Sequence, residues 1–207
     1  YIGTTDQPLS KNGAAKLKDL ADRCRYPDAD AFFVSPLKRC IQTLDILYPY
    51  AKPEIVEDLR EYDFGAYENK SFMDLKDDPD FQKWVAAKGT TMPPHGEDTT
   101  AFQERCCNAF IKIVDKLLHS GTTRAVLCAH GGTIMFILAA FGYPNRPFYR
   151  WMTSNGHGYE IVLTPQLWMS AHAFDIAATI PENEPDANLS GAGNLMDALT
   201  IPPEEEK

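Results

Sequence analysis

Short apolar runs that alternate with helical patterns constrain the fold of this chain more than any other feature. Two runs are apolar and of strand length, Ala31–Val34 and Ala125–Ala129, and Ile55–Leu59 also looks like a strand. Apolar residues recur at helical spacing in four further segments: residues 14–24, 37–47, 102–117 and 133–140. Strands that alternate with helices predict an α/β fold of three layers, in which a mostly parallel sheet is flanked by helices.

Local signals predict where several elements begin and end. Ser35 followed by Pro36 is typical of a helix start, because a hydroxyl caps the first turn and proline suits its first position. We expect a late pair of strands at Tyr159–Leu163 and Trp168–Phe174. Residues 62–97 carry only patchy helical signals. We expect them to form a short helical cap over the carboxyl ends of the strands.

The length and charge of the chain limit its organisation and its partners. A chain of 207 residues suits one domain, placed at residues 1–180, and we expect residues 181–207 to form a loosely packed acidic tail. The tail carries −6 of the formal charge of −9, and no basic stripe is present, so neither nucleic acid nor a membrane surface is an expected partner. The most apolar run, Ile134–Phe141, is far shorter than the ~20 residues of a membrane-spanning helix.

The cysteines indicate the compartment. The five cysteines lie at positions 24, 40, 106, 107 and 128 and include no Cys-x-x-Cys pair, which argues against a zinc knuckle or a redox pair. Reduced thiols fit a cytoplasmic protein. The oligomeric state stays open, with a homodimer as one alternative.

Three polar residues follow the predicted strands. Arg39 lies in the first turn of the helix after Ala31–Val34, Glu61 lies just past Ile55–Leu59, and His130 follows Ala125–Ala129 directly. Each has a structural alternative on its own: a surface charge for the arginine, a surface ion pair for the glutamate and a hydrogen-bonded core position for the histidine. Because ligands of α/β sheets bind beyond the carboxyl ends of the strands, we expect the three to meet there.

The combination of an arginine, an imidazole and a carboxyl group suits phosphoryl transfer. Arginine clamps phosphate oxygens through two parallel hydrogen bonds, histidine contacts phosphate or acts as acid, base or nucleophile, and a carboxyl group of raised pKa protonates a leaving oxygen. Other phosphatase motifs are absent from the sequence: none of the five cysteines begins Cys-x5-Arg, and Asp28-Ala-Asp30 comes before its strand instead of after it. No Gly-x-Ser-x-Gly elbow or Gly-x4-Gly-Lys-Ser/Thr loop occurs either.

Five sequence motifs occur in one order over about residues 1–165. They are Gly3-x-x-Asp6-x-Pro8-Leu9-Ser10, Ser35-Pro36-Leu37-Lys38-Arg39-Cys40-x-Gln42-Thr43, Leu59-Arg60-Glu61-Tyr62-Asp63-Phe64-Gly65, Gly96-Glu97-Asp98 and Ala129-His130-Gly131-Gly132. Together they resemble the histidine phosphatase superfamily, the phosphoglycerate-mutase-like proteins. The short cap resembles that of small bacterial phosphatases, including α-ribazole phosphatases, more than that of mutases proper.

The resemblance implies a role for each motif. Arg39 and His130 would bind the phosphoryl group, and Glu61 would be the proton donor. The substrate-binding set implied by the motifs also contains three further residues: Gly3, Glu97 and Gly131. The implied activity is a metal-independent phosphomonoester hydrolase without a cofactor, acting on a small phosphorylated metabolite. A phosphoglycerate mutase is the alternative within the family.

One family motif has no counterpart in these residues. The family opens with a core strand that ends in Arg-His-Gly, whose histidine becomes phosphorylated, and no Arg-His-Gly occurs here. Loss of a central strand would leave apolar faces and backbone hydrogen-bonding groups unpaired, so we expect this segment to precede Tyr1 in the natural protein. The alternative is a catalytically inactive relative that binds phosphorylated ligands.

Overall fold

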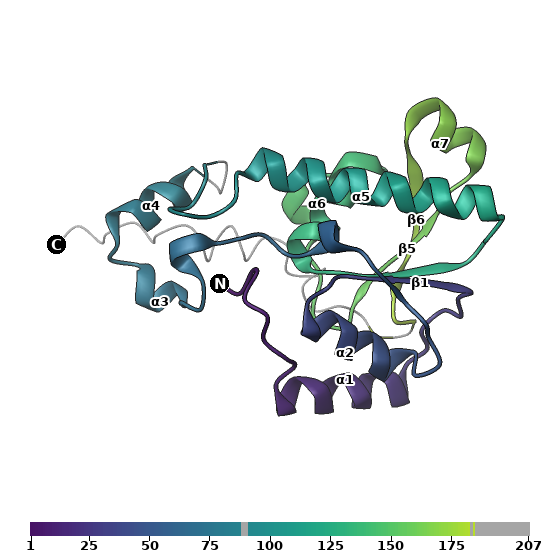
Figure 1. The fold of residues 1–207 in the computed structure, drawn as a ribbon, viewed down its shortest axis with the longest axis horizontal. Helices are drawn as coiled ribbons and strands as arrows, with labels where there is room; N and C mark the ends of the chain where they lie inside the picture. Colours follow the sequence, from purple (N-terminus) through teal and green to yellow (C-terminus); the bar gives the residue numbers. More distant parts are fainter. Residues whose placement is uncertain (88–90, 183, 185–207) are drawn as a thin grey trace.

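The chain folds into strands and helices that alternate along the sequence, which confirms the predicted α/β class (Figure 1). The computed structural model describes residues 1–87, 91–182 and 184. The strands are β1 (Ala31–Val34), β2 (Glu54–Ile55), β3 (Ala125–Cys128), β4 (Gly142–Tyr143), β5 (Gly158–Val162) and β6 (Phe174–Ile180). The α-helices are α1 (Lys11–Arg23), α2 (Lys38–Leu47), α3 (Phe72–Leu75), α4 (Pro79–Ala86), α5 (Thr99–Ser120), α6 (Gly131–Phe141) and α7 (Pro165–Ala171). Three 3₁₀ turns are η1 (Glu57–Leu59), η2 (Gly65–Tyr67) and η3 (Phe148–Trp151).

The strands form two sheets of three strands each. The first has the order β2-β1-β3, and both of its pairings are parallel. The second has the order β4-β6-β5, with β4 parallel and β5 antiparallel to β6. The prediction of a mostly parallel arrangement is therefore confirmed, with β5 as the exception.

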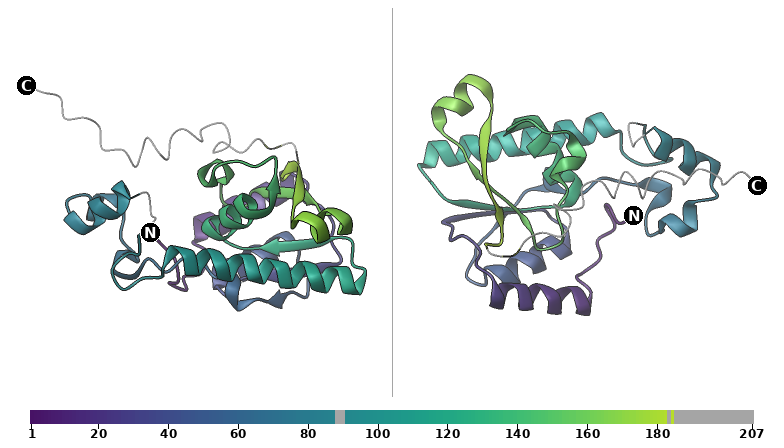
Figure 2. Two further views of the ribbon diagram at one scale, coloured as in Figure 1. Left: turned by 90° about the horizontal axis from the view of Figure 1, so that it is seen from above. Right: turned by 180° about the vertical axis from the view of Figure 1, so that it is seen from behind.

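Helices cover both faces of the first sheet, which explains why its strands β1 and β3 are apolar throughout. In Figures 1 and 2, α5 and α6 lie on one side of the strands and α1 and α2 on the other. Along β1, Phe33 packs into the larger core with α5 and α6, whereas Phe32 and Val34 pack with α2. A strand covered on both faces needs apolar side chains in both directions, as this sequence has.

The expected cap is present as a separate lobe. Figures 1 and 2 place α3 and α4 beyond the ends of β1 and β3 at which α2 and α6 begin. Tyr67, Leu75 and Phe81 form its small buried core, and the rings of Tyr1 and Trp84 pack against that core. The N-terminal residue is thus part of the cap.

Two predicted boundaries near the site are wrong. Of the strand expected at Ile55–Leu59, only Ile55 lies in a strand; the chain then turns into η1, where the part-buried Arg105 binds the carbonyl of Asp58. Ser35 does not cap α2: that helix begins at Lys38 without a side-chain cap, and the hydroxyl of Ser35 bonds the imidazole of His130 and accepts from the amide of Leu37.

The second late strand is also misplaced. Trp168 lies in helix α7, and the strand begins only at Phe174. Thr164 caps this helix through its hydroxyl, which accepts from the amide of Leu167, and Pro165 occupies the first turn. Thr164 and Pro165 are thus the hydroxyl–proline pair that is typical of helix starts, and this pair indicated the start of α7.

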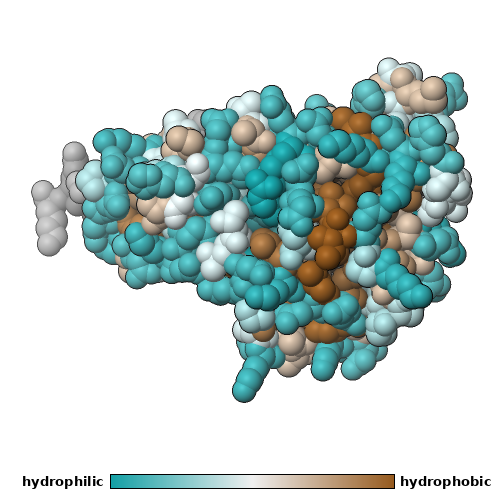
Figure 3. Space-filling model, viewed as in Figure 1, coloured by the Kyte–Doolittle hydropathy of each residue, from teal (hydrophilic) through white to brown (hydrophobic). Residues whose placement is uncertain are grey.

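The beginning of the predicted tail is attached to the domain. The backbone of Glu182 forms an isolated antiparallel β-bridge with that of Arg25, and the side chain of Glu184 accepts a hydrogen bond from Arg23 at 3.1 Å. The rest of the expected tail lies outside the described residues. Figure 3 shows apolar side chains at the surface in a band over the middle of the molecule, whereas the end that carries α3 and α4 is mainly hydrophilic.

Candidate active site

The structure brings the side chains of Arg39 and His130 into direct contact. Arg39 is the second residue of α2, which follows β1, and His130 is the residue between β3 and α6. Because β1 and β3 are parallel neighbours, their carboxyl ends lie together. Nε of Arg39 donates to Nδ1 of His130 at 3.3 Å, so two residues 91 positions apart meet as the sequence predicted.

The contacts of His130 define its tautomer. Since Nδ1 accepts from Arg39, the ring proton of a neutral imidazole resides on Nε2, where it donates to the hydroxyl of Ser35 at 2.6 Å. Both Ser35 and His130 are buried. Ser35 thereby orients the imidazole, a role that the sequence analysis missed because it assigned this hydroxyl to helix capping.

The two outer nitrogens of Arg39 hold the N-terminal segment. Nη1 donates to the carbonyl of Thr5 at 2.9 Å and Nη2 to that of Gly3 at 2.6 Å. On its other side, this segment donates the amides of Gly3, Thr4 and Thr5 to the carboxylate of Glu68. Gly3 is buried, and a side chain there would overlap the carbonyl of Tyr62. Gly3 therefore meets the arginine through its backbone.

Glu61 is buried beside the start of α6. Its Oε2 accepts from the amide of Gly132 at 3.0 Å, and its Oε1 accepts from the amide of Tyr62 at 2.9 Å. Burial raises the pKa of Glu61, against the opposing effects of these two amides and of the charges of Arg39 and Arg105. A buried carboxyl group that keeps its proton is a candidate proton donor.

The start of α6 is open next to His130. His130 occupies the position before the first turn and makes no side-chain capping bond. Gly131 is exposed, and a Cβ built on it would meet nothing within 4 Å, whereas one on Gly132 would lie 2.5 Å from Oε1 of Glu61. The first turn thus combines free space with the partial positive charge of a helix N-terminus, which favours an anion.

Glu97 is engaged by a residue that the sequence analysis missed. Its carboxylate accepts from Nε and Nη2 of Arg105 at 2.6 and 2.8 Å. Arg105 also donates to three backbone carbonyls, those of Asp58, Arg60 and Glu61. The signal for Arg105 was a charge on the apolar face of the predicted helix, three residues after a phenylalanine. The substrate-binding role of Glu97 stays a prediction; the observed role is to hold the arginine that positions Glu61.

Cys40 borders the site without the properties of a nucleophile. Its sulfur lies 3.5 and 3.6 Å from the two ring nitrogens of His130 and 3.3 Å from the carbonyl of Ala129. A hydrogen bond with Cys128 and burial raise the pKa of this thiol, so it stays protonated. Cys40 is therefore a small buried side chain beside the site.

Among the described residues, no group of three or more His, Cys, Asp or Glu side chains could hold a metal ion. No helix in the same part of the chain combines the length and apolarity that crossing a membrane requires.

The arrangement supplies what binding and protonating a phosphate ester require. The guanidinium of Arg39 and the imidazole of His130 meet at the start of α6. The buried carboxyl group of Glu61 binds the amide of Gly132, the second residue of that helix. The guanidinium and the helix start favour a phosphoryl group, and the carboxyl group can donate a proton. The contacts of Arg39, His130 and Glu61 are observed, while their roles in binding and catalysis are predictions.

Comparisons with known proteins agree with the fold. The chain is similar to the structure of a putative alpha-ribazole-5'-P phosphatase from Escherichia coli, with a TM-score of 0.72, 20% identity and 86% of each chain covered. The alpha-ribazole phosphatase from Shigella flexneri gives a TM-score of 0.71 at 20% identity, again over 86% of each chain. At these identities the likeness concerns the fold.

A phosphoglycerate mutase from Thermus thermophilus is more similar in sequence and less similar in shape. It gives a TM-score of 0.59 at 26% identity and covers 86% of this chain and 87% of its own. A search of curated proteins returned no match. A family model of the histidine phosphatase superfamily (branch 1) matches residues 1–175. The chain therefore belongs to branch 1 of the histidine phosphatase superfamily.

Proposed function

We propose that this protein is a metal-independent phosphomonoester hydrolase that works through a phosphohistidine intermediate. Membership of the superfamily supports phosphatase or mutase-type activity. The observation that carries the finer proposal is the 3.3 Å contact between Arg39 and His130, at a helix start that also binds the buried Glu61.

In this proposal Arg39 and His130 bind the phosphoryl oxygens. The guanidinium supplies fixed positive charge, and the imidazole of His130 supplies a hydrogen-bonding group beside the phosphoryl group. The phosphoryl group passes to the histidine of the family's Arg-His-Gly segment. Water then attacks the phosphohistidine and releases inorganic phosphate.

Glu61 is the proposed proton donor. As the bond from phosphorus to the ester oxygen breaks, the carboxyl proton of Glu61 moves to that oxygen and the alcohol leaves. The resulting carboxylate accepts a proton from the attacking water in the second step, which restores the acid. Proton transfer of this kind contributes ~10²–10⁴-fold to a rate, most for leaving groups that are poor without protonation.

The small number of cations in the cap favours a hydrolase over a mutase. A mutase must bind a substrate that carries a carboxylate as well as a phosphate, yet the cap offers few cations for the second group: Lys70, Lys76, Lys83 and Lys88. Lys76 and Lys83 are paired with Asp77 and Asp80. Lys88 lies outside the described residues.

The proposed substrate is a small phosphorylated metabolite, and the proposed compartment is the cytoplasm. All five cysteines are free thiols. A reducing compartment keeps thiols in this state, which supports the proposed cytoplasmic location.

The test is turnover of p-nitrophenyl phosphate in EDTA by a form of the protein that carries the family's Arg-His-Gly segment. We expect activity that persists in EDTA and falls by at least ~10²-fold in His130→Ala and in Arg39→Ala. The control His119→Ala, an exposed histidine at the end of α5, should match the parent. Activity that EDTA abolishes, or that neither site variant reduces, contradicts the mechanism. Conversion of 3-phosphoglycerate to 2-phosphoglycerate at a comparable rate would instead assign a mutase.

A further inference from the structure

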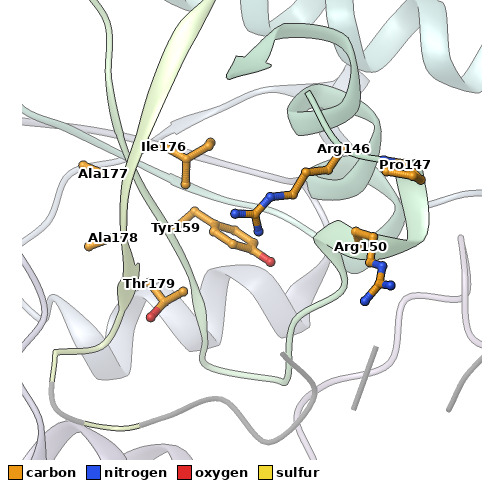
Figure 4. Close-up of a pocket in the computed structure, with 8 residues that line it drawn as sticks. All are labelled: Arg146, Pro147, Arg150, Tyr159, Ile176, Ala177, Ala178 and Thr179. Carbon is orange, nitrogen blue, oxygen red and sulfur yellow. The ribbon is translucent and has the colours of Figure 1, made fainter. Parts of the chain in front are cut away.

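A cavity lies away from the candidate active site. It is an open hollow of about 550 Å³ between the strands β5 and β6 on one side and the segment 146–150 on the other, and most of the residues that line it are exposed (Figure 4). None of Arg39, Glu61 and His130 lines it. Its volume falls within the ~300–1,000 Å³ typical of small-molecule sites.

Two arginines give this cavity its charge. Arg146 and Arg150 both line it, and no acidic residue does. In Figure 4, the guanidinium of Arg146 reaches from its loop toward Tyr159 and Ile176, while Arg150 comes from η3 on the same side. Within the described part of the chain, neither arginine takes part in an ion pair.

Packing holds one of these guanidinium groups in place. The guanidinium carbon of Arg146 lies 4.9 Å from the ring centre of Trp151, which is fully buried. The attraction between a cation and an aromatic face fixes the plane of the guanidinium, so less freedom is lost when it binds a ligand. The arginine is therefore prepared for a planar, two-oxygen partner.

The opposite wall is apolar with a polar end. Ile176, Ala177 and Ala178 contribute aliphatic surface, and Thr179 adds a hydroxyl at the end of β6. A ligand that fits must place anionic oxygens near the arginines and an apolar body against β6. Inorganic phosphate alone would leave most of the cavity unfilled.

We propose that this cavity is a second ligand site, which binds a small organic anion whose phosphate or carboxylate groups meet Arg146 and Arg150 and whose apolar body rests on β6. The site is independent of the proposed catalytic function, because it shares no residue with the candidate active site. A phosphorylated and a carboxylated ligand are distinguished by the probes below.

Calorimetric titration of the full-length protein with phenylphosphonate and with phthalate tests the proposal. Both probes carry anionic oxygens on an apolar ring, and neither is a phosphate ester that the enzyme could hydrolyse. The titration uses Arg39→Ala, so that binding at the candidate active site is weakened. We expect one remaining site, occupied more tightly by phenylphosphonate if the ligand is a phosphate and by phthalate if it is a carboxylate.

The decisive comparison is between two double variants of equal charge. Arg146→Ala/Arg150→Ala in the Arg39→Ala background should lose at least ~10-fold in affinity for the preferred probe. Arg23→Ala/Arg124→Ala removes two exposed arginines elsewhere and should lose less than ~2-fold. Arg150→Ala alone avoids the packing of Arg146 on Trp151 and should still lose several-fold.

Three results would overturn the proposal: no binding of either probe, equal losses in the two double variants, or unchanged affinity in Arg150→Ala. Circular dichroism confirms that each variant is folded. If the cavity binds its probe while p-nitrophenyl phosphate is not hydrolysed, the proposed function fails and the second ligand site stands. If p-nitrophenyl phosphate is hydrolysed while neither probe binds, the second ligand site fails and the proposed function stands.

Discussion

Glu61 shows how one buried carboxyl group couples stability to pH. Its carboxylate is enclosed, and burial raises its pKa above the ordinary 4.5. The unfolded chain therefore releases this proton at a lower pH than the folded chain does. Below the unfolded pKa both states are protonated and Glu61 has its full stabilising contribution. That contribution is lost as the pH rises toward the folded pKa.

The variant Glu61→Gln tests this coupling, because glutamine has the shape of the protonated acid and does not ionise. We expect the difference in Tm between Glu61→Gln and the parent to move in favour of glutamine as the pH rises from about 4 to about 8. Thermal unfolding at several pH values measures it. The exposed Glu104→Gln is the control and should show no such trend. A difference that stays constant with pH contradicts the raised pKa.

Substitution by alanine should affect stability differently at the two glycines that follow His130. A methyl group at Gly132 would collide with Oε1 of Glu61 at 2.5 Å, whereas one at Gly131 would enter free space. We expect Gly132→Ala to lower the free energy of unfolding by about 1–3 kcal/mol. Gly131→Ala should stay within about 0.5 kcal/mol of the parent. Urea unfolding measures both.

The same pair tests the site. Because Gly131 borders the open space next to His130, Gly131→Ala should weaken binding of inorganic phosphate while stability is kept. Phosphate binding equal to that of the parent would remove Gly131 from the substrate-binding set.

At the scale of elements, Arg105 fastens α5 to the chain around Glu61. It binds three carbonyls and the carboxylate of Glu97 with a side chain that is only 11% exposed. Lysine keeps the charge but cannot reproduce this fork of donors. The position of the proton donor thus depends on a residue in another helix.

The variant Arg105→Lys should lower the free energy of unfolding by about 1–3 kcal/mol, since buried carbonyls lose their donors. Arg124→Lys breaks a similar fork with Asp30, but that pair is more than half exposed, so its cost should be below about 1 kcal/mol. Equal costs in urea unfolding would show that Arg105 is not the stronger attachment.

The elements that the sequence predicted well are those with strong periodicity. The helix that became α5 was predicted from the apolar spacing of residues 102–117, and it carries an aspartate cap at Asp98 and a left-handed glycine at Gly121. The contact of Arg39 with His130 followed from the rule that parallel strands share an edge. These features depend on local patterns and on topology.

The elements that the sequence predicted poorly depend on single long-range contacts. Ser35 has the local signal of a cap, but its hydroxyl binds an imidazole 95 residues away. The strand expected at Ile55–Leu59 ends early where Arg105 binds the carbonyls that follow. In contrast, α7 was missed although Thr164 and Pro165 signalled it locally, because its apolar residues also suited a strand.

At the scale of the whole molecule, charge is concentrated at the C-terminal end of the sequence. Residues 185–207 hold five acids and one lysine, which is −4 of the total of −9. Because phosphomonoesters are anions, this charge repels the proposed substrate over a distance that salt shortens to ~10 Å at 0.1 M.

Removal of residues 185–207 should therefore raise kcat/KM for p-nitrophenyl phosphate at low salt, by less than ~10-fold, and the gain should vanish at high salt. Steady-state kinetics at several ionic strengths measures it. The control replaces the five acids by their amides and keeps the length; it should give the same gain. A gain that persists at high salt would point to something other than charge.

The donors of Arg39 are already in use before any ligand arrives. Its outer nitrogens bind the carbonyls of Gly3 and Thr5, and its inner nitrogen binds His130. An incoming group must compete with these oxygens, and only one of higher charge density does so effectively. The site should accordingly discriminate by ionisation state: doubly charged monoesters bind, whereas diesters and sulfate esters, which carry a single negative charge, leave the guanidinium where it is.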